Sequence, residues 1–305
     1  RRCVLETAMT IKTNPLKHSE LGQAAPAGLF VTDFDGTLLR SDRTFSQKDL
    51  TALENLAKLQ ITRIIATGRS MHSFLTVGVH NLPVDYLIFS TGAGVAEWPS
   101  RRLVRVVSLS KREVRHICAV LSEAQIDLMV LRPIPKTHYF AYSTAGEPGA
   151  DFFRRIDLYS PYAEKLEDNG RNFGEATQIL VIVPAKIGPA TLEKVRSALP
   201  EFSIILTTSP LDGESTWIEI FPKGVSKSAT AQWLAQELNA LDGNTLSVGN
   251  DYNDIDLLDW ATASYVVANA PTDMRERYAS VVSNDNGGVA EAIKKWRTAQ
   301  NGGVS

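Results

Sequence analysis

The chain has 305 residues, 44% of them hydrophobic and 22% charged, an ordinary composition for a folded globular protein of about two domains. Its 32 basic and 34 acidic residues give a formal net charge of −2, so no positive excess predicts binding to nucleic acid or to an anionic membrane. No apolar run reaches the length of about 18 residues that predicts a membrane span, and Cys3 and Cys118 are too few and too far apart for a disulfide framework or a zinc site. We therefore expect a cytoplasmic protein.

Short apolar runs alternate with amphipathic stretches from Gly28 onward, a pattern typical of βαβ units around a parallel sheet. Residues 1–27 show no sustained periodicity and are treated as an N-terminal tail outside the fold prediction. In chain order, the first expected elements are strands at 29–32, 61–66 and 86–89, with a helix that begins after Ser46. Each of these strands ends in a polar or glycine-rich turn.

The middle of the chain has a different pattern, with expected strands at 103–108, 126–131, 137–142, 178–183 and 203–206. Two helices are predicted inside it, one after the capping box formed by Ser110 and Glu113, the other at 187–199. The strand and helix alternation then resumes, with helices at 225–241, 253–260, 272–278 and 289–297 and strands at 246–248 and 265–267. The sequence therefore predicts a core domain from residues 28–97 and 223–305, interrupted by an inserted α/β domain at 98–222.

Two aspartates follow the first expected strand directly, in the segment DFDGT. Residues at positions i and i+2 of an extended backbone project to the same side, so Asp33 and Asp35 are expected to converge where α/β sheets bind ligands. A hard cation with oxygen ligands, most naturally Mg²⁺, would relieve their repulsion and leave open positions for a phosphate. The two aspartates alone fit equally well a capped loop with solvated carboxylates.

Two further segments indicate anion binding. Thr67 and Gly68 stand between a strand and a helix, where free backbone N–H groups form anion sites, although an ordinary turn has the same pattern. Lys227 is predicted in the first turn of a long helix, where the helix dipole disfavours a cation, so an anionic group should compensate it. A surface lysine is the alternative for this position and describes Lys223 well.

A fourth polar segment, GNDYND at 249–254, follows the strand predicted at 246–248. Its acids and amides could supply metal ligands and acceptors that support them. A helix N-cap would need only one such residue, so capping alone explains Asn253 or Asp254 but not the whole set.

Taken in order, DFDGT, ATGR, Lys227 at a helix start and GNDYND resemble the motifs of the haloacid dehalogenase superfamily. The resemblance is to subclass IIB, the Cof-type and sucrose-phosphatase-like branch with a large α/β cap between the second and third motifs. It covers nearly everything from Gly28 to Arg297. It implies an α/β fold, with a doubly wound, Rossmann-like parallel-sheet core and a cap that closes over the site and selects the substrate.

The resemblance also implies roles for individual residues. Asp33 would be the nucleophile that forms an aspartyl-phosphate, and Asp35 the general acid and base. Thr67 and Gly68 would hold the phosphoryl oxygens, with Lys227 balancing charge between the phosphate and Asp33. Mg²⁺ would be held by Asp33, by the backbone carbonyl of Asp35 and by an acid of the fourth motif, with Asn253 supporting the site.

The fourth motif departs from the common Gly-Asp-x-x-Asn-Asp pattern, because Asn250 occupies the first acidic position and Asp251 follows it. An amide oxygen can ligate Mg²⁺ but brings no charge, so Asn250, Asp251 and Asp254 all stay candidates for the third ligand.

Together these features predict a Mg²⁺-dependent phosphatase whose partner is a small phosphorylated metabolite, with a sugar phosphate as the best candidate substrate. A sugar phosphomutase is the nearest alternative, because similar motifs can return the phosphoryl group to a sugar. A non-catalytic sensor that binds a phosphosugar or a metal is the alternative from another class of protein, with Asn250 as a sign of lost chemistry. The oligomeric state is not predicted.

Overall fold

The computed structural model of the chain describes residues 10–14, 25–79, 81–240 and 243–301. The chain divides into two compact units. We call Thr13–Arg105 with Ser226–Ser305 the core unit, and Arg1–Lys12 with Val106–Val225 the inserted unit. Among the helices of the described ranges, none has the length and apolar character needed to cross a membrane.

The core unit holds most of a nine-stranded sheet with the strand order β1-β6-β5-β4-β3-β2-β13-β14-β15, in which most of β1 and the second half of β6 belong to the inserted unit. The strands are β1 (Thr10–Thr13), β2 (Gly28–Thr32), β3 (Ile61–Ala66), β4 (Tyr86–Phe89), β5 (Gly94–Glu97), β6 (Leu103–Ser108), β13 (Thr245–Gly249), β14 (Ala263–Val267) and β15 (Ser280–Val281). Strands β4, β3, β2, β13, β14 and β15 pair in parallel, whereas β5 is antiparallel to β4. The predicted fold class, a mainly parallel α/β sheet, is confirmed.

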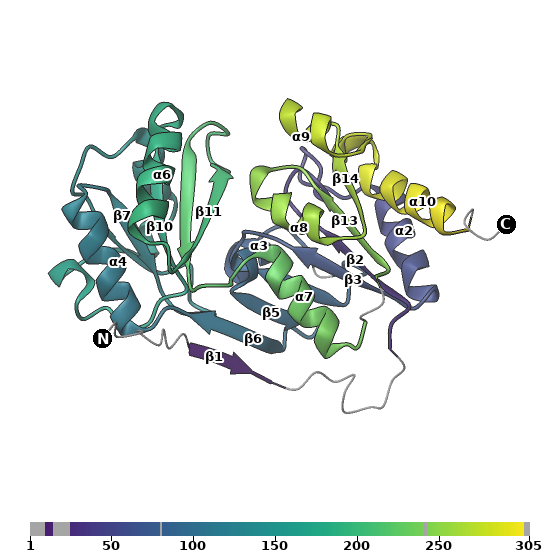
Figure 1. Cartoon of the computed structure of the whole chain (residues 1–305), viewed down its shortest axis with the longest axis horizontal. Helices are drawn as coiled ribbons and strands as arrows, with labels where there is room; N and C mark the ends of the chain where they lie inside the picture. Colours follow the sequence, from purple (N-terminus) through teal and green to yellow (C-terminus); the bar gives the residue numbers. More distant parts are fainter. Residues whose placement is uncertain (1–9, 15–24, 80, 241–242, 302–305) are drawn as a thin grey trace. The chain divides into compact units, whose positions relative to one another are not determined.

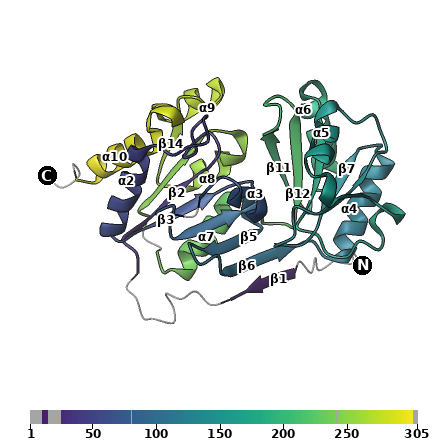
Figure 2. The same cartoon turned by 180° about the vertical axis from the view of Figure 1, so that it is seen from behind.

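Helices cover both faces of this sheet, as Figures 1 and 2 show from opposite sides. The helices of the core unit are α2 (Gln47–Lys58), α3 (Met71–Leu75), α7 (Lys227–Glu237), α8 (Ile255–Trp260), α9 (Thr272–Arg277) and α10 (Gly288–Asn301). On one face, Leu29 and Val31 of β2 share a buried cluster with Leu234 of α7. Helices α2 and α10 lie side by side, with α2 against β3 and α10 against β13. The central strand β2 is accordingly buried along its whole length, as its apolar sequence GLFVT predicts.

The inserted unit holds a six-stranded sheet with the order β11-β12-β10-β7-β8-β9. Its elements are α4 (Lys111–Glu123), β7 (Leu128–Leu131), β8 (Phe140–Ser143), α5 (Ala150–Leu158), β9 (Ala163–Lys165), β10 (Gln178–Val183), α6 (Gly188–Ala198), β11 (Ser203–Thr208) and β12 (Thr216–Phe221). Short 3-10 turns complete the two units: η1 (Ser90–Gly92), η2 (Ser160–Tyr162), η3 (Asp168–Gly170), η4 (Ala185–Ile187), η5 (Tyr252–Asp254) and η6 (Asn284–Asn286). The predicted capping box of Ser110 and Glu113 begins α4.

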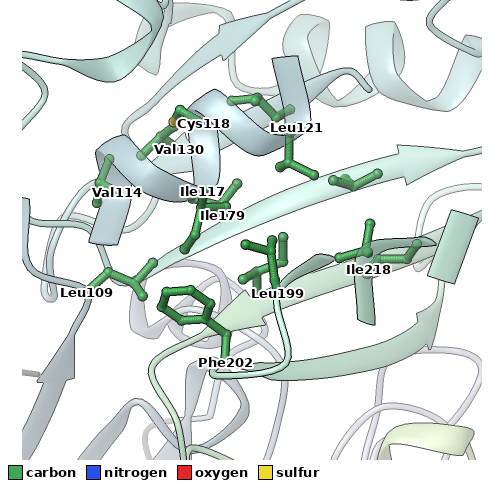
Figure 3. Close-up of a cluster of buried hydrophobic side chains, with 14 of the residues drawn as sticks. Leu109, Val114, Ile117, Cys118, Leu121, Val130, Ile179, Leu199, Phe202 and Ile218 are labelled. Atoms are coloured by element: carbon green, nitrogen blue, oxygen red, sulfur yellow. The ribbon is translucent and has the colours of Figure 1, made fainter. Parts of the chain in front are cut away.

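The inserted unit has its own hydrophobic core. Figure 3 shows Ile117 and Leu121 of α4 pointing towards Ile179 and Ile218 of the sheet, in a cluster to which α6 also contributes. Cys118 is a buried free thiol in this cluster, and Cys3 lies outside the described residues. The strand residues that alternate with those of the first cluster form a second cluster with Phe152 of α5. Side chains on both faces of the six-stranded sheet are therefore packed.

The structure differs from the sequence prediction in several strands: β5, β9 and β15 were not predicted, and β1, β6 and β12 also depart from the prediction. Strand β6, expected in the inserted domain, is a strand of the nine-stranded sheet. The chain turns back after β5, where the Glu97 N–H donates to the Arg102 carbonyl and the Glu97 carbonyl accepts from the Arg101 N–H. Strand β12 was not predicted, since Glu219 interrupts its apolar pattern; this glutamate is buried and accepts a hydrogen bond from Gln178. Strand β1 lies within the segment treated as a tail, and Asn14 next to it bonds the backbone carbonyls of Leu103 and Val104.

Candidate active site

The predicted motifs lie at one edge of the parallel sheet of the core unit. Asp33 follows β2, Thr67 follows β3, and Asn250 follows β13. Thr32, the last residue of β2, is in register with Ile65 of β3 and with Val248 of β13. The carboxyl ends of the three strands are therefore adjacent, which is where open α/β sheets bind ligands.

A buried lysine links two of these segments. Lys227 is in the first turn of α7, and its Nζ lies 2.6 Å from Asp33 Oδ1 and 2.6 Å from Asp254 Oδ1. The lysine and Asp254 are fully buried, and Asp33 is 6% exposed. The anionic compensation that the sequence predicted for Lys227 thus consists of two carboxylates, which leaves the group of three with one net negative charge when all are ionised.

This environment changes the acidity of both partners. Burial, and secondarily the nearby Asp254 carboxylate, raises the pKa of Asp33 to about 8, although Lys227 opposes the shift. Burial by itself would lower the pKa of Lys227, but the carboxylates of Asp254 and Asp33 outweigh it and raise the pKa, so the lysine stays protonated. A second cation next to Asp33 would favour its ionised form.

The side-chain amide of Asn250 faces the other oxygen of Asp33. One end of the amide lies 3.0 Å from Asp33 Oδ2, 2.8 Å from the backbone oxygen of Asp35 and 2.9 Å from the hydroxyl oxygen of the buried Thr37. Thr37 was not predicted as a site residue, although it belongs to the DFDGT segment. Asp33, Asp35 and Asn250 therefore meet at one point, with Asp35 contributing its carbonyl rather than its carboxylate.

The Asp35 carboxylate instead forms a two-pronged ion pair with Arg69. Arg69 Nε and Nη2 each donate to one carboxylate oxygen at 2.7 Å, and Nη1 donates to the backbone and side-chain oxygens of Ser73 at 3.2 Å. The sequence analysis quoted Arg69 within ATGR but gave it no role. Its position directly after Gly68 was the available signal.

Thr67 and Gly68 lie beside these groups. Thr67 is buried, and its hydroxyl oxygen accepts from the Arg69 backbone N–H at 3.1 Å. A Cβ on Gly68 would lie 3.5 Å from Thr91 Oγ1 and 3.8 Å from Asn253 Nδ2, so Gly68, Thr91 and Asn253 are neighbours. Thr91, in the turn after β4, is a further site residue that the sequence did not identify.

The two acids of the fourth motif have other partners. Asp254 Oδ2 accepts from the backbone N–H groups of Asn250 and Asp251 at 2.9 and 3.1 Å, and Asp251 Oδ1 accepts from the Tyr252 N–H at 2.8 Å. Gly249 allows this loop to close, because a Cβ there would lie 2.6 Å from the Asp254 Cβ. Among the described residues, no group of three or more His, Cys, Asp or Glu side chains is arranged to hold a metal ion. The groups that do converge are Asp33 Oδ2, the backbone carbonyl of Asp35 and one end of the Asn250 side-chain amide.

Comparison with known proteins identifies the family. Residues 30–293 match the model of the haloacid dehalogenase-like hydrolases, so the chain belongs to that family. One curated relative is the Bacillus subtilis protein named "Putative phosphatase YxeH", which is 23% identical over 275 residues that cover 87% of this chain and 96% of the relative. The family and the hydrolase enzyme class expected from the motifs are confirmed.

Solved structures share the fold over most of this chain. The subclass IIB sugar phosphatase BT4131 superposes with a TM-score of 0.68 at 17% identity, over 89% of this chain and 99% of that one. The phosphatase BT1666 from Bacteroides thetaiotaomicron superposes with a TM-score of 0.71 at 18% identity, over 89% and 96% of the two chains. The fold of subclass IIB, a parallel-sheet core with an inserted cap, is therefore the fold of this chain.

Proposed function

We propose that the protein is a Mg²⁺-dependent phosphatase of a small phosphorylated metabolite, with a sugar phosphate as substrate. The observation that carries this proposal is the position of Asp33. One of its carboxylate oxygens accepts a hydrogen bond from the buried Lys227, and the other lies next to the amide of Asn250, which also contacts the backbone carbonyl of Asp35. The sugar phosphate is suggested by the similarity to a subclass IIB sugar phosphatase.

In the first half of the reaction, an oxygen of Asp33 attacks the phosphorus and the bond to the sugar oxygen breaks, which leaves an aspartyl-phosphate. A carboxylate is a weak nucleophile towards a phosphate dianion because the two repel each other. Lys227 reduces that repulsion, since its ammonium group lies 2.6 Å from Asp33 Oδ1.

Asp35 is the proposed proton carrier. As an acid it gives a proton to the departing sugar oxygen, and as a base it takes a proton from the water that attacks the aspartyl-phosphate, so inorganic phosphate leaves and Asp33 is regenerated. Its carboxylate is held by both prongs of Arg69, which makes Arg69 a positioning residue for this step. Thr67 and Gly68 are proposed to bind the phosphoryl oxygens, because they follow β3 at the same edge of the sheet as Asp33 and Asn250.

We propose that Asp33, the backbone carbonyl of Asp35 and the amide oxygen of Asn250 would hold Mg²⁺. Oxygen ligands of this ion lie at about 2.0–2.1 Å in octahedral geometry, so adjacent ligands are about 2.9 Å apart. The amide end of Asn250 lies 2.8 Å from the Asp35 carbonyl oxygen and 3.0 Å from Asp33 Oδ2, close to that spacing. When bound, Mg²⁺ would supply positive charge that neutralises the phosphate and favours the ionised form of Asp33.

The test is phosphate release from a panel of sugar phosphates with Mg²⁺, next to an EDTA control and an Asp33→Asn variant. We expect turnover that both controls abolish. Transfer of the phosphate to an isomeric sugar without release would support the mutase instead. Tight binding of a phosphosugar by the Mg²⁺-supplied protein, without turnover of any compound, would support the sensor.

A further inference from the structure

The two ends of the half-buried Asn250 amide face different groups. One end faces Asp33 Oδ2, the Asp35 carbonyl oxygen and Thr37 Oγ1 at 3.0, 2.8 and 2.9 Å. The other end lies over Gly36, whose φ of +69° and missing side chain create the space: a Cβ there would lie 2.8 Å from the amide. The two ends of an amide have nearly the same size, so a half-turn about Cβ–Cγ exchanges oxygen and nitrogen at the same two positions.

The two orientations suit two different states of the site. With Oδ1 inward, the amide accepts from the Thr37 hydroxyl at 2.9 Å, but it also opposes its oxygen to two other acceptors, the Asp33 carboxylate and the Asp35 carbonyl. Facing acceptors are unfavourable in a partly buried site unless a cation lies between them. With Nδ2 inward, the amide donates hydrogen bonds to those same oxygens and satisfies them without a cation.

We infer that Asn250 is a reversible substitute for the metal: its Nδ2 bonds Asp33 and Asp35 in the metal-free protein, and its amide rotates to present Oδ1 when Mg²⁺ binds. This inference deepens the proposed function and rests on its metal site. A carboxylate at position 250 could not act in this way, because it has no N–H to donate and would add a further negative charge beside Asp33.

The rotation has a measurable cost for metal binding. Mg²⁺ must displace the hydrogen bonds that Asn250 makes to Asp33 and Asp35, and it gains a neutral oxygen ligand rather than a charged one. In the metal-free protein, these hydrogen bonds satisfy the acceptor oxygens of Asp33 and Asp35. An acid at position 250 should therefore bind Mg²⁺ more tightly but destabilise the metal-free protein.

The first experiment compares Mg²⁺ binding to the full-length wild type, Asn250→Asp and Asp251→Asn by isothermal titration calorimetry. We expect Asn250→Asp to lower the Kd about ten-fold or more, since it adds a charged ligand and removes the competing amide. The melting temperature of Asn250→Asp should lie below that of the wild type in EDTA and recover in saturating Mg²⁺. Asp251→Asn tests the other candidate for the third ligand in the same loop, and the inference expects its Kd to stay within two-fold of the wild type.

The second experiment observes the amide itself in ¹⁵N-labelled protein. The side-chain NH₂ signals of Asn250 are identified by their disappearance in Asn250→Asp. In the metal-free wild type these protons should exchange slowly with water, because they are hydrogen-bonded, and saturation with Mg²⁺ should shift the signals and speed their exchange. Signals that stay unchanged at saturating Mg²⁺ would overturn the rotation.

The outcomes separate this inference from the proposed function. If the wild type hydrolyses sugar phosphates with Mg²⁺ but Asn250→Asp binds the ion no more tightly, the inference about Asn250 is wrong and the phosphatase proposal stands. If no phosphate ester is hydrolysed but the affinity, stability and amide signals change as expected, the inference stands and the phosphatase proposal fails. A loss of Mg²⁺ binding in Asp251→Asn would assign the third ligand to Asp251 and overturn the role of Asn250.

Discussion

Lys227 of α7 connects two loops of the proposed active site. Its side chain is fully buried, and its ammonium group is in contact with Asp33 and Asp254, which belong to segments that follow β2 and β13. A buried charge is tolerated only when it is paired. The lysine therefore holds two loops together at the same time as it places a positive charge beside the proposed nucleophile.

Replacing Lys227 by Met should lower the free energy of unfolding by about 3–5 kcal/mol, because it leaves two buried carboxylates without their cation. Urea denaturation measures the loss. Lys223→Met is the control, since that lysine is exposed in the preceding loop and should change stability little. Similar small effects in both variants would show that the buried ion pairs do not stabilise the fold.

Arg69 is the second residue with a predicted effect, because its two hydrogen bonds fix the orientation of the Asp35 carboxylate. Replacing it by Lys keeps the charge but loses the second prong that holds Asp35, so the proposed phosphatase turnover should fall about ten- to hundred-fold with little change in KM. Steady-state kinetics measures the change. Arg63→Lys is the matched control, because Arg63 makes a similar two-pronged pair with Asp85 away from the site. Equal losses in both variants would indicate a general effect on folding instead.

At the scale of elements, α2 and α10 are joined by a buried carboxylate. Asp49 of α2 has no exposed surface, and its Oδ1 accepts from the Ala290 backbone N–H at 2.7 Å, in the first turn of α10. The first turn of a helix has unpaired N–H groups, which an acidic side chain from a neighbouring helix can satisfy. Burial nevertheless outweighs this bond and raises the pKa of Asp49 to about 6.

The raised pKa predicts how stability changes with pH. In the folded protein Asp49 keeps its proton up to about pH 6, whereas in the unfolded chain it loses the proton near its ordinary pKa of 3.8. The contribution of Asp49 to the free energy of unfolding therefore decreases as the pH rises from about 4 to about 6, and it is constant above that range. Asp49→Asn should remove this decline, on the order of 2 kcal/mol. Urea denaturation at pH 4.5 and pH 7 provides the measurement.

Glu54→Gln serves as the control for that prediction, because Glu54 is exposed on the same helix. It should leave the difference in stability between the two pH values as in the wild type. A wild-type difference that Asp49→Asn leaves intact would mean that another buried acid causes it.

At the scale of the whole molecule, the chain consists of two units with separate hydrophobic cores. Every residue proposed for the reaction lies in the core unit, whereas the cluster around Ile117, Ile179 and Ile218 belongs to the inserted unit. A change confined to one core should thus be felt mainly in that unit.

Ile179→Ala should lower the free energy of unfolding of the inserted unit by about 2–5 kcal/mol, because it leaves a cavity in a closely packed cluster. Hydrogen exchange followed by mass spectrometry should show faster exchange in 106–225, with the Mg²⁺ Kd of the folded protein unchanged. Ile64→Ala, in the cluster of the core unit, should instead speed exchange in that unit. Faster exchange throughout the chain in Ile179→Ala would contradict the independence of the two cores.

Local patterns were enough to predict most elements and the motifs. The apolar run before Asp33, the capping box at Ser110 and the motif order are properties of neighbouring residues, and they led to the right fold class and family. The strand β12 was missed because Glu219 looks like a break in an apolar run. Its burial depends on Gln178, which is 41 residues away in the chain, and no local pattern contains that partner.

The class of fold, the family and the segments that meet at the edge of the sheet could all be predicted from the sequence, because periodicity and motif spacing are properties of neighbouring residues. The partners of each polar side chain at that edge depend on the tertiary structure. The Asp35 carboxylate pairs with Arg69, and the amide of Asn250 faces Asp33. One carboxylate oxygen of Asp254 binds Lys227, and the other accepts from the backbone of its own loop. Such contacts join residues far apart in the chain, and only packing determines which donor reaches which acceptor.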